Sequence, residues 1–139
     1  MKYNTPLLLL LLLALSACNL EGTHTKKTQS TGIIGQWQWV ETTGGFAGIT
    51  DKPDVLGYPM VIMNFSSSNR YSVVRNDTLV RTGTFTLSKQ NNKEILKMTP
   101  SDTSFSYNPT EEVTYKGNDT LILMDRCYDC FITTYIRIN

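Results

Sequence analysis

Eight short segments with the character of β-strands are separated by turn-forming residues, and this pattern constrains the fold more than any other feature of the sequence. The segments span residues 34–41, 60–65, 70–75, 78–87, 94–99, 112–116, 120–124 and 131–138. Short strand-like runs with turns every 8–12 residues or so are typical of β-sandwiches and β-barrels. No window shows a sustained apolar period of 3.6 residues, so we expect little helix.

The connections after the second segment are short and hairpin-like. Gly117, Asn118 and Asp119 give a strong hairpin signal, because these residue types tolerate the backbone conformations of tight turns. Antiparallel strands in sequence order tend to close into a barrel, since closure removes exposed edges. The sequence therefore predicts an all-β, eight-stranded antiparallel up-and-down barrel over residues 33–139. A barrel of that size is filled by side chains or has room for one small ligand.

Alternation along the segments identifies the side chains that would face the interior. Trp37 and Trp39 lie two residues apart on the first segment and share a face. The matching positions on later segments are Met63, Phe65, Tyr71, Val73, Phe85 and Leu87. Such a row is more often a packed core than a ligand site, and both interpretations stay open for Trp39, Phe65, Tyr71 and Phe85.

One connection, residues 42–59, is long and glycine-rich. Its glycines could suggest a phosphate cradle, but neither a Gly-Lys-Ser/Thr triplet nor a helical pattern follows them. We expect an Ω-loop that packs Phe46 and Tyr58 onto the barrel end. Its middle could act as a lid over the barrel.

The first 17 residues have the pattern of a secretory signal peptide. Lys2 precedes an unbroken run of leucines over residues 7–13, and small residues then lead to a cysteine. The apolar run is about half of the roughly 20 residues that a bilayer span needs. The ending Leu15-Ser16-Ala17-Cys18 resembles the lipobox of bacterial lipoproteins. That resemblance implies cleavage before Cys18 and acylation of its sulfur and amino group, with palmitate as a typical chain.

The segment behind Cys18 predicts a tether. Residues 18–32 are mostly polar and include the single histidine, His24, so they cannot bury enough apolar area to order themselves. The whole chain has a formal net charge of +1, and removing the leader with Lys2 leaves 12 basic and 12 acidic residues. Balanced charge gives no basis for nucleic-acid binding or polybasic membrane binding. Attachment to a membrane must then be covalent.

The body resembles lipocalins. Gly35-Gln36-Trp37 on the first segment matches their Gly-x-Trp hallmark, and Arg137 on the last segment matches the arginine that packs across this tryptophan. More narrowly, the chain resembles the lipocalin-like lipoproteins of Bacteroidetes. The resemblance implies a closed barrel end at Gly35, Trp37 and Arg137, and a ligand-binding interior. The chain is shorter than secreted lipocalins and lacks the helix that follows their last strand, and a shorter barrel could be filled.

Cys127-Tyr128-Asp129-Cys130 lies between the last two segments. A redox Cys-x-x-Cys works at a helix N-terminus, and a structural zinc site needs four ligands, so neither use fits a hairpin with one such pair. An oxidising envelope permits a local disulfide between Cys127 and Cys130, and two buried thiols are the alternative. Asp125 and Asp129, together with backbone carbonyls, could hold a calcium ion, but no calcium-loop motif supports that, and we expect no metal.

The sequence gives no basis for an enzyme. The body contains no histidine, so no nucleophilic triad can be assembled. Its acids, Glu111 and Asp125 among them, lie at turns and strand ends, where we expect solvation. We therefore expect a lipoprotein of the cell envelope, anchored at the outer membrane, which binds a small apolar or saccharide ligand and uses no cofactor. The alternative is a filled barrel that acts as an interaction or inhibitor module for an envelope protein.

Overall fold

The computed structural model describes residues 32–53, 57, 60–102 and 108–138. Cys18, the leader, the tether and Tyr58 lie outside them. All regular structure within these ranges is β-strand, and no helix there is long and apolar enough to cross a bilayer. The strands are β1 (Gly35–Gly44), β2 (Ile49–Asp51), β3 (Val61–Phe65), β4 (Arg70–Arg75), β5 (Thr78–Gln90), β6 (Lys93–Pro100), β7 (Thr110–Lys116), β8 (Thr120–Asp125) and β9 (Phe131–Ile138).

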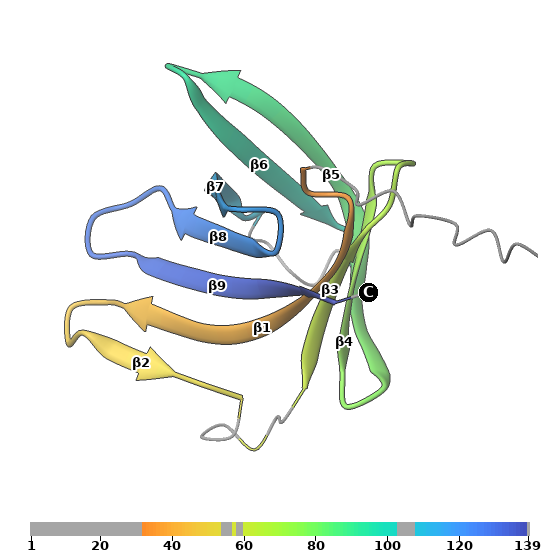
Figure 1. The fold of residues 1–139 in the computed structure, drawn as a ribbon, viewed down its shortest axis with the longest axis horizontal. Coiled ribbons are helices and arrows are strands. Elements are labelled where there is room, and N and C mark those ends of the chain that lie inside the picture. Colours follow the sequence, from red (N-terminus) through yellow and green to blue (C-terminus); the bar gives the residue numbers. More distant parts are fainter. Residues whose placement is uncertain (1–31, 54–56, 58–59, 103–107, 139) are drawn as a thin grey trace, which may run out of the picture.

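The strands form one closed antiparallel sheet. β3 to β9 pair in sequence order, and β1 pairs with both β3 and β9. β1 and β3–β9 therefore make an eight-stranded up-and-down barrel, which confirms the predicted fold (Figure 1). The predicted segments 70–75 and 131–138 match β4 and β9 residue for residue.

β1 changes partner along its length. Gly35–Gln38 faces β3, whereas Thr42–Gly44 faces β2, and a bulge between Trp39 and Glu41 separates the two halves. The extra residue of a bulge bends the strand, which here turns the second half of β1 away from β3. The start of the long connection thus extends β1, and Ile49–Asp51 folds back on it as β2.

The position of Phe46 differs from the one predicted from the sequence. It lies in the turn between β1 and β2, closed by a hydrogen bond of 3.0 Å from the Gly48 amide to the Gly45 carbonyl, and its side chain is 97% exposed. The expectation that Phe46 packs onto the barrel end is therefore wrong. Pairing with β2 carries the turn outward, away from the barrel end (Figure 1).

The core contains most of the residues that the alternation along the strands predicts to face the interior. Trp37, Trp39 and five of the matching positions are buried or pack against the buried cluster; these five are Met63, Phe65, Tyr71, Val73 and Phe85. Leu87 is the exception, at 39% exposed. Its prediction as an interior residue is wrong, because β5 and β6 continue past the core as a projecting hairpin (Figure 1). That hairpin turns at Asn91 and Asn92, both with positive φ as tight turns require.

Candidate functional site

The barrel has a sealed proximal end, where β1 begins and β9 ends. Trp37 is fully buried there, and its Nε1 donates to the Ile33 carbonyl at 2.7 Å. The guanidinium of Arg137 lies 4.0 Å from the centre of the Trp37 ring, a favourable cation–π geometry. Gly35 has a φ of +133°, which side chains rarely adopt, and a Cβ there would also overlap Nη1 of Arg137, so both features favour the glycine of this motif. The structure thus brings Gly35, Trp37 and Arg137 together.

Arg137 also ties three chain segments to one another. Its Nε donates to the Asn118 carbonyl at 2.9 Å, Nη1 to Ile34 at 2.8 Å and Nη2 to Gly32 at 2.7 Å. A planar guanidinium can stack on an indole and still direct donors to several acceptors in its plane. One residue therefore joins the entry to β1, the β7–β8 turn and β9.

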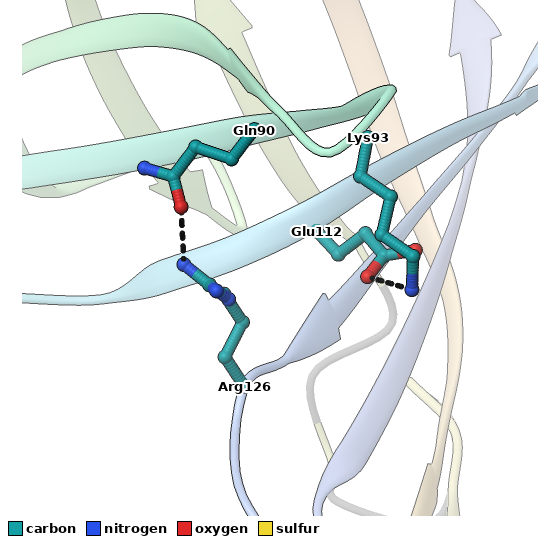
Figure 2. A network of polar contacts seen from close by, with 4 residues as sticks. All are labelled: Gln90, Lys93, Glu112 and Arg126. Atoms are coloured by element: carbon teal, nitrogen blue, oxygen red, sulfur yellow. Dashed lines mark hydrogen bonds and ion pairs between the residues drawn. The ribbon is translucent and has the colours of Figure 1, made fainter.

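Substituting Arg137 with lysine is expected to lower the free energy of unfolding by about 2 kcal/mol, because an ammonium cannot replace the stacked fork. Urea denaturation measures this. Arg126→Lys is the matched control, since Arg126 donates one exposed hydrogen bond, 3.1 Å long, to Gln90 (Figure 2). The control is expected to change stability by less than about 0.5 kcal/mol. Equal effects of the two substitutions would contradict the assigned role.

The opposite, distal end is where β1 finishes and β9 begins, and hydrogen-bonding side chains gather there. Trp39 Nε1 donates to Thr42 Oγ1 at 3.0 Å, and that hydroxyl lies 3.1 Å from Thr133 Oγ1. On β8, Leu121 and Leu123 are buried and face the interior. Because side chains alternate along a strand, Asp125 has the same inward direction, at the distal end. The inner wall is therefore apolar at mid-barrel and partly polar at the distal end.

Glu111 and Asp125 are direct cross-strand partners on this distal wall. Glu111 also faces the fully buried Leu96 on β6. Burial, and then the charge of Asp125, raises the pKa of Glu111 to about 7. Its Oε2 is buried and forms no hydrogen bond with the described residues. The expectation of solvation is therefore wrong for Glu111, although the alternation of Glu111, Val113 and Tyr115 could have indicated its direction.

Tyr135 lies with these two acids. It is only 8% exposed, and its pKa is raised by burial and then by the negative charges of Glu111 and Asp125. Burial also raises the pKa of Asp125, while a hydrogen bond from the Phe131 amide opposes that rise. The three groups therefore act on one another across β7, β8 and β9.

The next acid along β7 lies in a contrasting environment. Glu112 points to the outer face, where its Oε2 accepts a hydrogen bond of 2.8 Å from Lys93 Nζ (Figure 2). An exposed ion pair of this kind adds little to stability. Glu112 therefore offers a control for Glu111 that differs by one position in the chain and by its side of the wall.

The β8–β9 loop closes on a disulfide between Cys127 and Cys130. The two sulfurs and a carboxylate oxygen of Asp125 lie within 4.8 Å of one another. Sulfurs joined in a disulfide are not thiolate ligands, so this group holds no metal in its oxidised form. A Cβ at Gly44 would overlap the Cys130 carbonyl, which shows that the loop packs against the end of β1.

The distal loops also expose apolar side chains. Phe46 on the β1–β2 turn is 97% exposed and Tyr128 on the β8–β9 loop is 95% exposed. Ile49, three residues after Phe46, and Phe131, three residues after Tyr128, are each about half-exposed. The Phe131 ring also lies close to Gly45 on the β1–β2 turn. We call Phe46, Ile49, Tyr128 and Phe131 the distal apolar tips.

An open depression of about 490 Å³ lies at the proximal end, and neither Glu111 nor Asp125 is among its lining residues. Its lining includes residues 32–34 and, from the β5–β6 hairpin, Leu87 and Glu94. Glu94 already accepts a hydrogen bond of 3.0 Å from Tyr115. Among the described residues, the buried Glu111 Oε2 without a hydrogen-bond partner lies on the distal wall and not in this depression.

Comparisons with known proteins identify no family. No family model and no curated protein matches this sequence. Among solved structures, the chain is similar to a de novo designed fluorescence-activating β-barrel, with 10% sequence identity and a TM-score of 0.48. The match covers 76% of this chain and 94% of the designed chain. The closed barrel therefore rests on the strand pairing itself.

Proposed function

We propose that the protein is a lipid-anchored envelope lipoprotein whose barrel binds a small molecule, without catalysis, in its distal half. The convergence of Trp39, Thr42, Thr133, Glu111 and Asp125 on the distal inner wall carries this proposal. Ligand sites are typically apolar surfaces with a few converging polar groups. The proximal end, sealed by Trp37 and Arg137, would serve as the floor of such a site.

The inner wall fits this role in its chemistry. Trp39, Met63, Met98 and Leu123 are buried members of the core cluster and make this wall apolar. Burying apolar area contributes roughly 25 cal/mol per Å² before the costs of association. The polar groups would then orient the ligand. A buried donor or acceptor without a partner costs free energy, so the favoured orientation is the one in which the ligand forms hydrogen bonds with these groups.

The substitution Thr133→Phe is expected to weaken the binding of an apolar probe about ten-fold or more, since the larger side chain would occupy the distal interior. The probe is N-phenyl-1-naphthylamine, an uncharged apolar fluorophore whose emission rises on binding. Thr134→Phe is the matched control, because Thr134 pairs with Glu41 and Ile122 on the outer face. Unfolding midpoints establish that both variants fold. Equal probe affinity in wild type and both variants would place the probe outside the barrel and contradict the proposal.

The proposed membrane attachment is based on the signal-peptide pattern of residues 1–17 and on Cys18, the residue expected to be acylated. Cys18→Ser is expected to abolish incorporation of labelled palmitate and to move the protein from the membrane fraction to the soluble fraction. Cys127→Ser is the control and should keep both label and membrane fraction. Two or three acyl chains hold a protein firmly, because each buried methylene contributes roughly 0.8 kcal/mol. Palmitate retained in Cys18→Ser would contradict the anchor.

The distal apolar tips favour a second candidate, an interaction or inhibitor module for an envelope protein. Aromatic residues exposed at loop ends are enriched in protein interfaces. This candidate predicts a stoichiometric envelope protein that co-purifies with wild type and is lost from Phe46→Ser and Tyr128→Ser. A native mass spectrum that shows a small molecule and no protein partner would select the first candidate.

A further inference from the structure

One edge of β5 carries main-chain groups that the barrel leaves unpaired at the proximal end. β4 begins at Arg70, opposite Thr84 of β5, whereas β5 continues to Gln90 in the projecting β5–β6 hairpin (Figure 1). The last backbone hydrogen bond on the β4 side runs from the Phe85 amide to the Asn69 carbonyl at 2.9 Å. Within the described ranges, β5 therefore has no strand beside it on this side beyond Phe85.

The direction of the unpaired groups follows from the pairing. Alternate residues of a strand direct their N–H and C=O groups to opposite sides. Because the Phe85 amide points to the β4 side, Leu87 and Lys89 direct their groups to that side as well, beyond the start of β4. Thr86 and Ser88 direct theirs to β6. The open edge thus offers the N–H and C=O of Leu87 and of Lys89 in the spacing of a β-ladder.

The proximal depression gives this edge room for a partner, which is an independent observation. Its volume of about 490 Å³ is within the range of ligand sites, roughly 300–1,000 Å³. Leu87 lines it together with residues 32–34, whose carbonyls accept hydrogen bonds from Trp37 and Arg137. Leu87 is 39% exposed and Lys89 is exposed, so both are accessible from solvent.

The side chains of this edge indicate what the partner carries. Leu87 and Lys89 lie two residues apart and share a face of β5. Among the described residues, Lys89 has no ion pair or hydrogen bond, and its cross-strand neighbour Glu94 accepts from Tyr115 instead. An acidic side chain opposite Lys89 would pair with its charge, and an apolar one would cover Leu87. A second copy fits less well, because it would add its own Lys89 to the same short ladder.

We propose that the β5 edge binds an extended peptide of another protein, which adds a strand antiparallel to β5 in line with β4. The peptide carries an acidic residue opposite Lys89 and, two positions later, an apolar residue opposite Leu87. Main-chain hydrogen bonds supply the affinity of such a complex, and the alternate side chains supply its specificity. This site is separate from the distal ligand site and does not depend on the proposed function.

Amide hydrogen exchange in the full-length protein tests whether the edge is open. The Leu87 and Lys89 amides are expected to exchange at least about ten-fold faster than those of Thr86 and Ser88, which bond to β6. Slow exchange at Leu87 and Lys89 without peptide would overturn the proposal, because the edge would already be occupied. Protection that is lost on dilution would identify a second copy as the occupant, and protection that persists would identify residues 19–31.

The binding probe is the fluorescein-labelled peptide Thr-Glu-Thr-Val-Thr, followed by fluorescence anisotropy up to about 1 mM protein. N-methylation of the glutamate or valine amide, which would face β5, should weaken binding about ten-fold or more. N-methylation of the central threonine is the matched control and should leave binding unchanged, since that amide would point away from β5. Equal effects at the three positions, or no binding of the parent peptide, would overturn the proposal.

Protein variants assign the contact to the β5 edge. Leu87→Pro should abolish binding and keep the β5–β6 ladder, because proline is tolerated where the N–H points out of the sheet. Lys89→Glu should weaken binding about five-fold and favour a probe with lysine in place of glutamate. Lys97→Glu, at an exposed position on the outer face of β6, is the control for charge. Urea midpoints establish that the variants fold. Equal effects of Lys89→Glu and Lys97→Glu, or full binding to Leu87→Pro, would contradict pairing at this edge.

Discussion

Replacing Trp37 with alanine is expected to lower the free energy of unfolding by about 3–5 kcal/mol. The indole is fully buried, lies under the Arg137 guanidinium and donates a hydrogen bond of 2.7 Å to Ile33. Its removal would leave a cavity and an arginine without its aromatic partner. Because small domains have roughly 5–15 kcal/mol in total, the variant should be close to its unfolding limit at room temperature. Urea denaturation followed by far-ultraviolet circular dichroism measures the loss.

Trp37→Phe serves as the control, since it keeps an aromatic face and most of the volume but loses the donor to Ile33. We expect this variant to retain more than half of the stability that alanine removes. If Trp37→Ala costs less than about 1 kcal/mol, the sealed proximal end does not hold the barrel together.

The second large effect is a dependence of stability on pH that Glu111 should dominate. Its pKa rises from 4.5 in the unfolded chain to about 7 in the barrel, so the folded state binds the proton more tightly. The stabilisation from the protonated group is complete below pH 4.5 and is lost as pH rises through 7. Such a difference in pKa corresponds to a change on the order of 3 kcal/mol.

Glu111→Gln should remove this dependence and be more stable than wild type above pH 7, because the glutamine stays neutral. Urea midpoints at pH 5, 6, 7 and 8 measure it, with Glu112→Gln as the control that keeps the wild-type profile. A Glu111→Gln profile parallel to that of wild type would show that the carboxylate is hydrated in the folded protein.

Local patterns were sufficient to predict the barrel. Alternation identifies β4 and β9 to the residue, and asparagine and glycine turns mark where hairpins reverse. Trp37 and Arg137 could be assigned to one contact because a motif names them, although 100 residues separate them in the sequence.

Such patterns do not predict the register in which strands pair or the path that the chain takes in space. Glu111 and Asp125 read as strand-end acids, and only the pairing of β7 with β8 shows that they face each other on the inner wall. Leu87 fits the interior alternation, yet the β5–β6 hairpin carries it past the core. The strand β2 has only three residues, and so short a strand gives too weak a sequence signal to predict the outward turn that exposes Phe46.

The most direct test of a ligand site in the distal half uses the indole signals of the two tryptophans in a ¹H–¹⁵N spectrum. Trp39 Nε1 bonds to Thr42 near the proposed site, whereas Trp37 Nε1 bonds to Ile33 at the sealed end. Titration with N-phenyl-1-naphthylamine is predicted to shift the Trp39 signal to saturation and to leave that of Trp37 in place. A probe that binds while the Trp39 signal stays unmoved would contradict a ligand site inside the barrel.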